Sequence, residues 1–188
     1  MTRYRRNSKN GFTFVELMIV IAVISILVLI SAPSLKELNK KMALHTSATE
    51  LVQNLRRVQE MAMSAQEFNG SIPSGGYGIW LEADSFPKTS YSLFADSNDN
   101  KKYDDTELIE SVVLEEGIEI ADVTSSPSGS LMHVIFKAPD PEVIFTKADG
   151  AEFSTWMILI LLSYGGETIF IEVNRAGLIY TSPAGGVS

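Results

Sequence analysis

An uncharged apolar run near the N-terminus limits what this chain can fold into more than any other feature. From Leu17 to Leu35 none of the 19 residues carries a charge. As an α-helix rising about 1.5 Å per residue, the run reaches roughly 28 Å, close to the thickness of a bilayer's hydrocarbon core. A lone strand in lipid would leave its backbone polar groups unpaired. We therefore expect a transmembrane helix over residues 12–34.

The charges before this run predict its orientation. Residues 1–11 hold four cations and no acid: Arg3, Arg5, Arg6 and Lys9. Positive charge is retained on the cytoplasmic side of a membrane helix. We expect a single-pass protein with a cytoplasmic N-terminus and an exported C-terminal part.

One acid, Glu16, lies at the start of the apolar block, after Phe12–Val15. A carboxylate there is costly unless it stays near the interface or pairs with a cation. A cut after Gly11 would expose the α-amine of Phe12, but a helix cannot easily fold its own terminus back to Glu16. A neighbouring molecule, shifted along the helix axis, could supply that amine. Glu16 is then predicted to set the register between subunits, its burial tolerated only when paired.

The segment Lys-Asn-Gly-Phe-Thr-Phe-Val-Glu, residues 9–16, resembles the N-terminus of type IV pilins and pseudopilins. Phe14 stands where leucine is commoner in that family. The resemblance implies cleavage between Gly11 and Phe12 by a prepilin peptidase, which also N-methylates Phe12. It further implies an assembly role for Glu16 and for Pro33, which falls where the family often has a helix-loosening proline. The alternative is an uncleaved signal anchor, which has no use for Glu16.

After Pro33 the helix is predicted to continue with a different character. Apolar residues such as Leu51, Leu55 and Val58 recur at three- and four-residue steps, with charged residues between them. This spacing is typical of an amphipathic helix with one apolar stripe, which should pack on a sheet. Asn69-Gly70 is a stop signal. We predict one helix from Phe12 to about Phe68.

The rest of the chain shows short β runs separated by Gly, Pro and Asp clusters, typical of an antiparallel sheet or sandwich. The segment 156–162 is predicted to be a central strand buried on both faces, and Glu115-Glu116-Gly117 the turn of a hairpin. The predicted runs are 77–82, 91–95, 108–114, 118–123, 132–137, 142–146, 156–163, 168–173 and 178–181.

The predicted fold class is therefore α+β: a long N-terminal helix packed on an antiparallel β-sheet or sandwich head. The predicted segments are a leader at 1–11, a transmembrane or filament-core helix at 12–34, an amphipathic half at 35–68 and a β-rich head at 69–188. This layout resembles the pseudopilins and minor pilins of the general secretion pseudopilin H and fimbrial T type.

The amino-acid composition argues against several kinds of site and partner. There is no cysteine, so disulfides and cysteine-ligated zinc are excluded. The net charge is −8 and would become −12 without the leader, which carries four cations and no acid. A strongly acidic surface repels phosphate backbones, so no nucleic-acid partner is expected. Some minor pilins capture DNA, but that needs clustered cations, and the tail after Val173 offers only Arg175.

An acidic loop in the head is a candidate calcium site. Oxygen-bearing side chains fall at the first, third, fifth, ninth and twelfth places of residues 96–107, which is the ligand spacing of an EF-hand-type loop. Lys101 occupies the usual glycine place, and Lys102 adds a second cation; both count against calcium. The alternative is a solvated polar turn between two strands. The candidate ligands are Asp96, Asn98, Asn100, Asp104 and Glu107.

No enzyme is predicted. The only histidines, His45 and His133, lie in no metal-ligand spacing and are expected to be ordinary surface or half-buried residues. No phosphate-binding glycine loop is present. The resemblance implies a minor structural subunit of a type IV pilus-like filament or a type II secretion pseudopilus, and the alternative is a DNA-capturing minor pilin of a competence system. Its implied partners are other subunits in a homo- or hetero-filament, the prepilin peptidase, an inner-membrane assembly platform and the bacterial inner membrane.

Overall fold

The computed structural model describes residues 11–81, 87–125, 133–138 and 142–183, with the backbone alone described for residues 30–36 and 183. The chain divides into two compact units, Met1–Asn39 and Lys40–Ser188, and the boundary falls inside the single long helix. The predicted leader, residues 1–10, lies outside the described residues, as do the side chains around Pro33.

Helix α1 (Phe14–Met63) is one continuous helix of 50 residues, and its backbone remains helical through Pro33. It begins two residues after Phe12 because Thr13 caps it: the Thr13 hydroxyl accepts a hydrogen bond from the Glu16 N–H at 3.3 Å. Within the described part of the chain, no helix combines the length and the apolarity needed to cross a bilayer.

The helix ends five residues earlier than the predicted Phe68. Ala65 has a φ of +49° and turns the chain into the left-handed region. The Gln66 N–H then bonds back to the Met61 carbonyl at 3.1 Å, and the Ala65 N–H bonds to the Ala62 carbonyl at 3.0 Å. The first of these bonds spans five residues, as in a Schellman termination. The helix therefore closes on its own last carbonyls before the Asn69-Gly70 turn begins.

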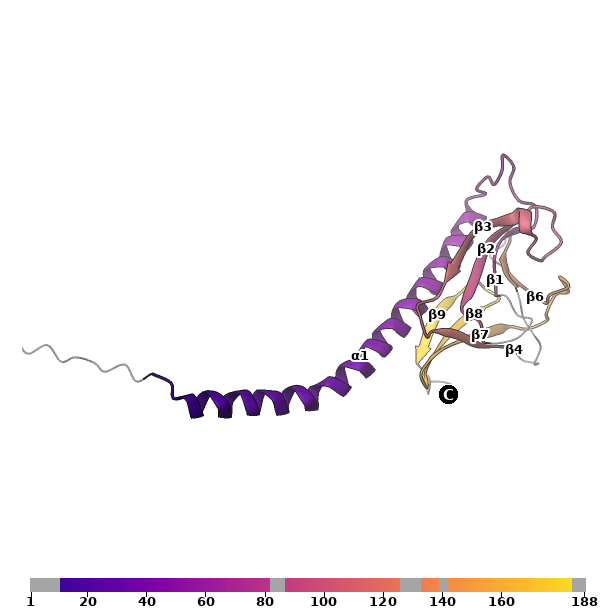
Figure 1. Cartoon of the computed structure of the whole chain (residues 1–188). Helices are drawn as coiled ribbons and strands as arrows, with labels where there is room; N and C mark the ends of the chain where they lie inside the picture. Colours follow the sequence, from indigo (N-terminus) through magenta and orange to yellow (C-terminus); the bar gives the residue numbers. More distant parts are fainter. Residues whose placement is uncertain (1–10, 82–86, 126–132, 139–141, 184–188) are drawn as a thin grey trace, which may run out of the picture. The chain divides into compact units, whose positions relative to one another are not determined.

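The head contains nine strands among the described residues, arranged in two antiparallel sheets (Figure 1). One sheet has the order β3-β2-β1-β5-β6 and the other the order β4-β7-β8-β9. The bounds are β1 (Gly76–Trp80), β2 (Ser90–Asp96), β3 (Leu108–Val113), β4 (Glu119–Ser125), β5 (His133–Phe136), β6 (Val143–Thr146), β7 (Met157–Tyr164), β8 (Glu167–Asn174) and β9 (Ile179–Pro183).

The predicted hairpin around Glu115-Glu116-Gly117 is wrong. Strand β3 pairs with β2, whereas β4 pairs with β7 in the other sheet. The turn instead carries the chain from one sheet to the other, with Leu114 and Ile118 on either side of it both buried. Burying these two side chains between the sheets keeps more apolar surface from water than an isolated hairpin would.

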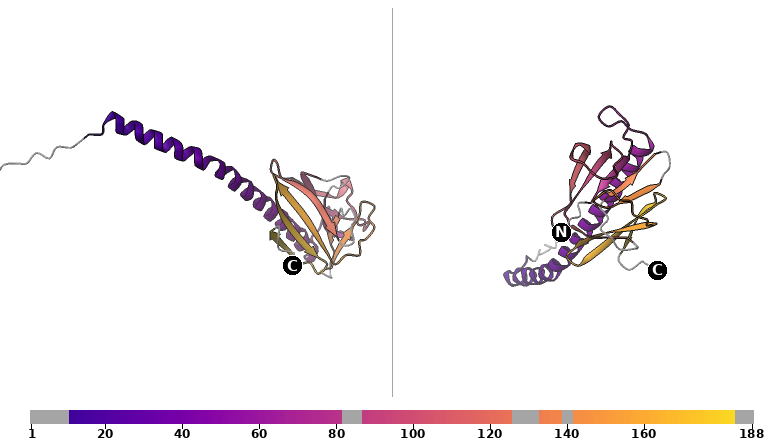
Figure 2. Two further views of the ribbon diagram at one scale, coloured as in Figure 1. Left: turned by 90° about the horizontal axis from the view of Figure 1, so that it is seen from below. Right: turned by 90° about the vertical axis from the view of Figure 1, so that its right-hand side faces the viewer.

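The C-terminal part of α1 packs against both sheets, so the head has a single core (Figure 2). Its buried stripe is Leu44, Ala48, Leu51, Val52, Leu55, Val58, Met61 and Ala62. Polar contacts fix the helix at its margins: the Asn54 amide donates to the Tyr91 hydroxyl at 2.8 Å, and the Gln59 amide donates to the Gly177 carbonyl at 3.0 Å. Tyr91 belongs to one sheet and Gly177 to the last turn of the other, so the helix joins the two.

Strand β7 is central in its sheet, between β4 and β8, but it is not buried on both faces as predicted. Ile158, Ile160 and Leu162 are fully buried against the core. The alternate residues, such as Leu159 and Leu161, are only half-buried, because the described residues place no second layer over that face. The α+β class, with an N-terminal helix packed on antiparallel sheets, is confirmed.

Candidate functional site

The bond predicted to be cleaved lies in exposed, non-helical chain. Gly11, Phe12 and Thr13 precede the first turn of α1, and all three are exposed. A Cβ placed on Gly11 would meet no other atom within 4 Å, so the fold itself does not require glycine there. A peptidase needs backbone that is free of helical hydrogen bonds, and the Gly11–Phe12 bond meets that condition.

Glu16 occupies the third position of the helix, in the sequence pattern Thr13-x-x-Glu16 of a capping box. Its negative charge is favourable there because unpaired N–H groups give a helix N-terminus a partial positive charge. Among the described residues, the Glu16 carboxylate has no ion-pair or hydrogen-bond partner. The structure thus explains why an acid is tolerated at this position and leaves its carboxylate free for another molecule.

The first part of α1 is apolar on every side. Its large hydrophobic side chains from Phe12 to Leu29 are between 44% and 82% exposed. The hydroxyl of Ser25 is satisfied within the helix by the Ile21 carbonyl at 2.8 Å. A helix that is hydrophobic all round is normally buried in protein or lipid, because exposing it to water is costly. This surface therefore needs an external partner.

All five predicted calcium ligands in residues 96–107 come together in one hydrogen-bonded loop. The side-chain amides of Asn98 and Asn100 both donate to the Asp104 carboxylate, at 3.0 and 2.7 Å. Asp96 accepts from the backbone N–H groups of Asn100 and Lys101, and the Glu107 carboxylate accepts from those of Ser97 and Asp104. The last turn of the loop is the short 3₁₀-helix η1 (Asp105–Glu107).

Two carboxylates of this loop are almost completely buried, Asp96 at 0% and Glu107 at 2% exposure. Burial raises the pKa of both carboxyl groups above their usual values, and backbone N–H donors partly offset that rise. Hydrogen bonds from Asn98 and Asn100 lower the pKa of Asp104 instead. The loop is organised around buried carboxylates that bind backbone rather than solvent.

The rest of the head is shaped to hold this loop. A Cβ on Gly75 would lie 2.1 Å from a carboxylate oxygen of Asp96, so only glycine fits beside it. A Cβ on Gly150 would lie 2.5 Å from the Asn100 carbonyl. Lys101, at the place where glycine is usual, has a φ of +63°, so the sharp turn forms with lysine in a left-handed conformation.

A buried polar chain continues from the loop into the sheet. The Thr146 hydroxyl donates to the Lys101 carbonyl at 2.7 Å. His133 Nδ1 lies 3.1 Å from the Thr146 hydroxyl and 3.2 Å from the Lys147 carbonyl. Because the Thr146 hydroxyl already donates its hydrogen to the Lys101 carbonyl, it can only accept from His133, and the Lys147 carbonyl can only accept as well. We therefore assign the proton to His133 Nδ1. The side chain of His133 is only 1% exposed, so His133 is buried and is not the surface or half-buried residue predicted. This burial lowers the pKa of His133 to about 4.

In this arrangement the loop is closed by its own hydrogen bonds. Calcium takes six to eight oxygens at about 2.3–2.6 Å. Here the amide nitrogens of Asn98 and Asn100, not their oxygens, face Asp104. Among the described residues, no group of three or more His, Cys, Asp or Glu side chains is arranged to hold a metal. Calcium would require those amides to turn over, so the site stays a prediction.

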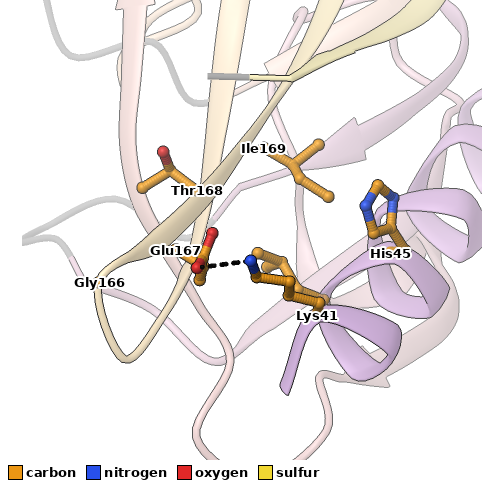
Figure 3. Close-up of a pocket in the computed structure, with 7 residues that line it drawn as sticks. Lys41, His45, Gly166, Glu167, Thr168 and Ile169 are labelled. Atoms are coloured by element: carbon orange, nitrogen blue, oxygen red, sulfur yellow. Dashed lines mark ion pairs between the residues drawn. The ribbon is translucent and has the colours of Figure 1, made fainter. Parts of the chain in front are cut away.

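His45, the other histidine, is exposed on α1 beside a shallow cleft of about 340 Å³ (Figure 3). Across this cleft, Lys41 Nζ pairs with a Glu167 carboxylate oxygen at 3.2 Å. Both partners are about half exposed, and such a pair contributes little to stability. The cleft offers no nucleophile held by a base, which an acyl-transfer or hydrolytic site would need.

Comparison with known proteins identifies the N-terminal segment. A family model described as the prokaryotic N-terminal methylation motif matches residues 6–32. No curated protein and no solved structure matches the chain. The match covers the predicted cleavage site, Glu16 and most of the apolar run. It indicates a prepilin-type N-terminal methylation segment over residues 6–32.

Sequence reasoning located the processing motif and the acidic loop but missed what supports the loop. Neither Gly75, which makes room for Asp96, nor the Thr146–His133 contact gave any local signal, because both depend on strands distant in sequence. Gly150 follows Asp149 in an ordinary turn pattern, and its role against the Asn100 carbonyl is visible only in three dimensions.

Proposed function

We propose that this protein is a structural, minor subunit of a type IV pilus-like filament or of a type II secretion pseudopilus. A prepilin peptidase removes residues 1–11 and methylates Phe12, and an inner-membrane assembly platform adds the chain to the filament. The observation that carries the proposal is the helix start. An exposed Gly11–Phe12 bond lies just before α1. The first turn of α1 is capped and carries one unpartnered carboxylate, and the helix then continues, up to Leu29, as a surface that is apolar on every side.

In this proposal the apolar helix is held first in the inner membrane and then among the helices of neighbouring subunits. Glu16 pairs with the α-amine of the next subunit's Phe12, and this pairing sets the register. Such a pair offsets the desolvation of both charges, whereas either charge alone would be strongly unfavourable. The head is not proposed to have enzymatic activity.

The decisive experiment replaces Glu16 with glutamine. Glutamine also suits the third position of a capping box and has nearly the same shape, so the helix start is kept while the charge is lost. We expect Glu16→Gln to reach the membrane and be processed, yet to be absent from sheared filaments. Glu37→Gln, an exposed acid on the same helix, should assemble normally. Filaments containing Glu16→Gln at wild-type levels would contradict the register role.

Mass spectrometry of the mature N-terminus tests the processing step separately. We expect a chain that begins with methylated Phe12. A chain that still begins at Met1 would leave no free Phe12 amine, and the filament proposal would fail.

DNA capture is the alternative, and the charge distribution of the head disfavours it. Six described cations of the head unit are paired with acids: Lys41, Arg57, Lys101, Lys102, Lys137 and Arg175. Arg175, the one cation of the tail region, pairs with Glu142 at 2.7 Å. Phosphate binding would have to break these pairs. A mobility shift at low ionic strength that weakens with salt would support DNA capture; we expect none.

A further inference from the structure

The turn that follows α1 contains the single Asn-x-Ser/Thr sequence of the chain, Asn69-Gly70-Ser71. This triplet is the acceptor sequence for N-linked glycans, provided that the middle residue is not proline and that the protein is exported. Asn69, Gly70 and Ser71 are all exposed. The sequence requirement and the exposure are therefore both met at this turn.

The turn presents the Asn69 side chain at its tip. Phe68 and Ser71 exchange two backbone hydrogen bonds, at 2.9 and 3.2 Å, which close a two-residue turn. Asn69 and Gly70 have φ values of +52° and +83°. A Cβ on Gly70 would meet nothing within 4 Å, so no other described part of the chain packs against the turn at Gly70.

Turn geometry explains two residues of the triplet but not the third. A turn with two left-handed central residues favours Asn-Gly, so Asn69 and Gly70 need no functional explanation. It places no demand on a hydroxyl at residue 71. Among the described residues, the Ser71 hydroxyl has no hydrogen-bond partner, although both backbone groups of Ser71 are bonded to Phe68. A serine at the position that completes the acceptor sequence is therefore not accounted for by folding.

We infer that Asn69 is a site of N-linked glycosylation, an inference that rests on the proposed export of the head. The co-substrate is a saccharide linked to a lipid pyrophosphate and delivered by a membrane oligosaccharyltransferase. Asn69 Nδ2 forms a bond to the anomeric carbon of the sugar. The bond from that carbon to the pyrophosphate oxygen breaks and its electron pair leaves with the lipid pyrophosphate. One amide proton passes to a base of the transferase, and no oxidation or reduction occurs.

The consequence for the head is local. The side chain of Ile72, next to the triplet, is 59% exposed, and that of Met63, at the end of α1, is 40% exposed. A glycan is bulky and solubilising, so it would shield apolar surface at this end of the head from water.

The experiment uses the full chain, exported by the cells that make it, with peptide mass spectrometry over residues 64–75. We expect the peptide to carry a saccharide mass with sugar fragment ions. Ser71→Thr keeps the acceptor sequence and should keep the modification. Ser71→Ala removes only the hydroxyl, and Asn69→Asp keeps a residue that tolerates the left-handed turn; both should lose the saccharide.

An unmodified wild-type peptide would overturn the inference. A mass gain of about one dalton would overturn it too, because it indicates hydrolysis of the Asn69 amide at an Asn-Gly sequence. The N-terminal peptide, read in the same digest, tests the filament proposal independently. A chain that begins at Phe12 without a glycan contradicts only the glycosylation, whereas a glycosylated chain that begins at Met1 contradicts only the filament.

Discussion

The two parts of helix α1 handle their apolar side chains in opposite ways. Between Phe14 and Leu29 the large hydrophobic residues are exposed on all sides, and among the described residues there is no second element against them. Between Leu44 and Ala62 the apolar residues form one stripe, buried against both sheets of the head. The first part leaves its hydrophobic surface for another molecule, and the second satisfies its own.

This difference assigns different consequences to mutations in the same helix. A truncation in the second part removes packing within one chain and lowers the free energy of unfolding of the head. A truncation in the first part removes a surface that no described element of the chain covers. It should therefore change insertion or assembly and leave the stability of the head unchanged.

The largest expected effect tests this division directly. Leu55 is fully buried, so Leu55→Ala should destabilise the head by roughly 2–5 kcal/mol, from lost burial plus the cavity left behind. Ile24 is 54% exposed, and Ile24→Ala should change the unfolding free energy by less than about 0.5 kcal/mol. Denaturant unfolding of the detergent-solubilised chain, followed by near-UV circular dichroism, measures both.

Ile24→Ala is thus the matched control for Leu55→Ala, since each removes aliphatic surface from the same helix. Equal destabilisation of the head by both variants would break the comparison, because it would mean that the first part of α1 is packed by its own chain.

The pH response of the head should depend on His133. The ordinary histidine pKa is about 6.5, and burial lowers that of His133 to about 4. As pH falls, the unfolded chain binds the proton first. The contribution of His133 to the free energy of unfolding is therefore constant above about pH 6.5 and falls between that value and about pH 4. The full loss is about 3.5 kcal/mol, since each unit of pKa difference is worth about 1.4 kcal/mol.

The check is an unfolding series at several pH values on wild type and His133→Gln. The variant should lose less stability than wild type over this interval, and the difference isolates His133 from Asp96 and Glu107, whose raised pKa values act in the opposite direction. His45→Gln, on the exposed face of α1, serves as the control. Parallel curves for His133→Gln and wild type would contradict the assignment.

Much of this division could be predicted from the sequence, because it rests on local patterns. The uncharged run and the three- and four-residue spacing each occur within a few helical turns, and each of the nine described strands overlaps a β run predicted between turn residues. The strand partners were not. The segment Glu115-Glu116-Gly117 has the composition of a hairpin turn, but β3 and β4 separate because their neighbours Leu114 and Ile118 are buried in the shared core.

The acidic loop shows the same limit. Its spacing marked five oxygen-bearing residues, and the structure brings them together. What the spacing could not show is that Asp96 and Glu107 bind backbone N–H groups, since those bonds depend on how the loop is wound.

The end of α1 was misplaced for a related reason: Ala65 adopts the left-handed conformation that glycine or asparagine was expected to supply.

Calcium binding would sharpen the contrast between the two parts of α1, because it would stabilise the head and leave the first part of α1 unaffected. If the loop binds calcium, we expect a higher melting temperature of the head in calcium than in chelator. The gain is about 2.7 kcal/mol when free calcium is 100 times its dissociation constant. Glu107→Gln should abolish this gain in stability. Glu152 lies outside the loop and pairs with Lys101, so Glu152→Gln should keep the gain. Equal melting temperatures in calcium and chelator would instead identify the loop as a turn closed by hydrogen bonds.

The smallest expected effect concerns the point where the buried part of α1 ends. Ala65 has a φ of +49°, a conformation that costs an L-residue with a Cβ roughly 1–2 kcal/mol. Ala65→Gly removes that cost, although glycine also loses more entropy on folding, so the net gain should be about 1 kcal/mol. Ala62→Gly, within the helix and buried, should lower stability by at least that amount. Opposite signs for these two substitutions, three residues apart, would place the helix end between them; a loss for both would mean that the helix extends through Ala65 towards Phe68.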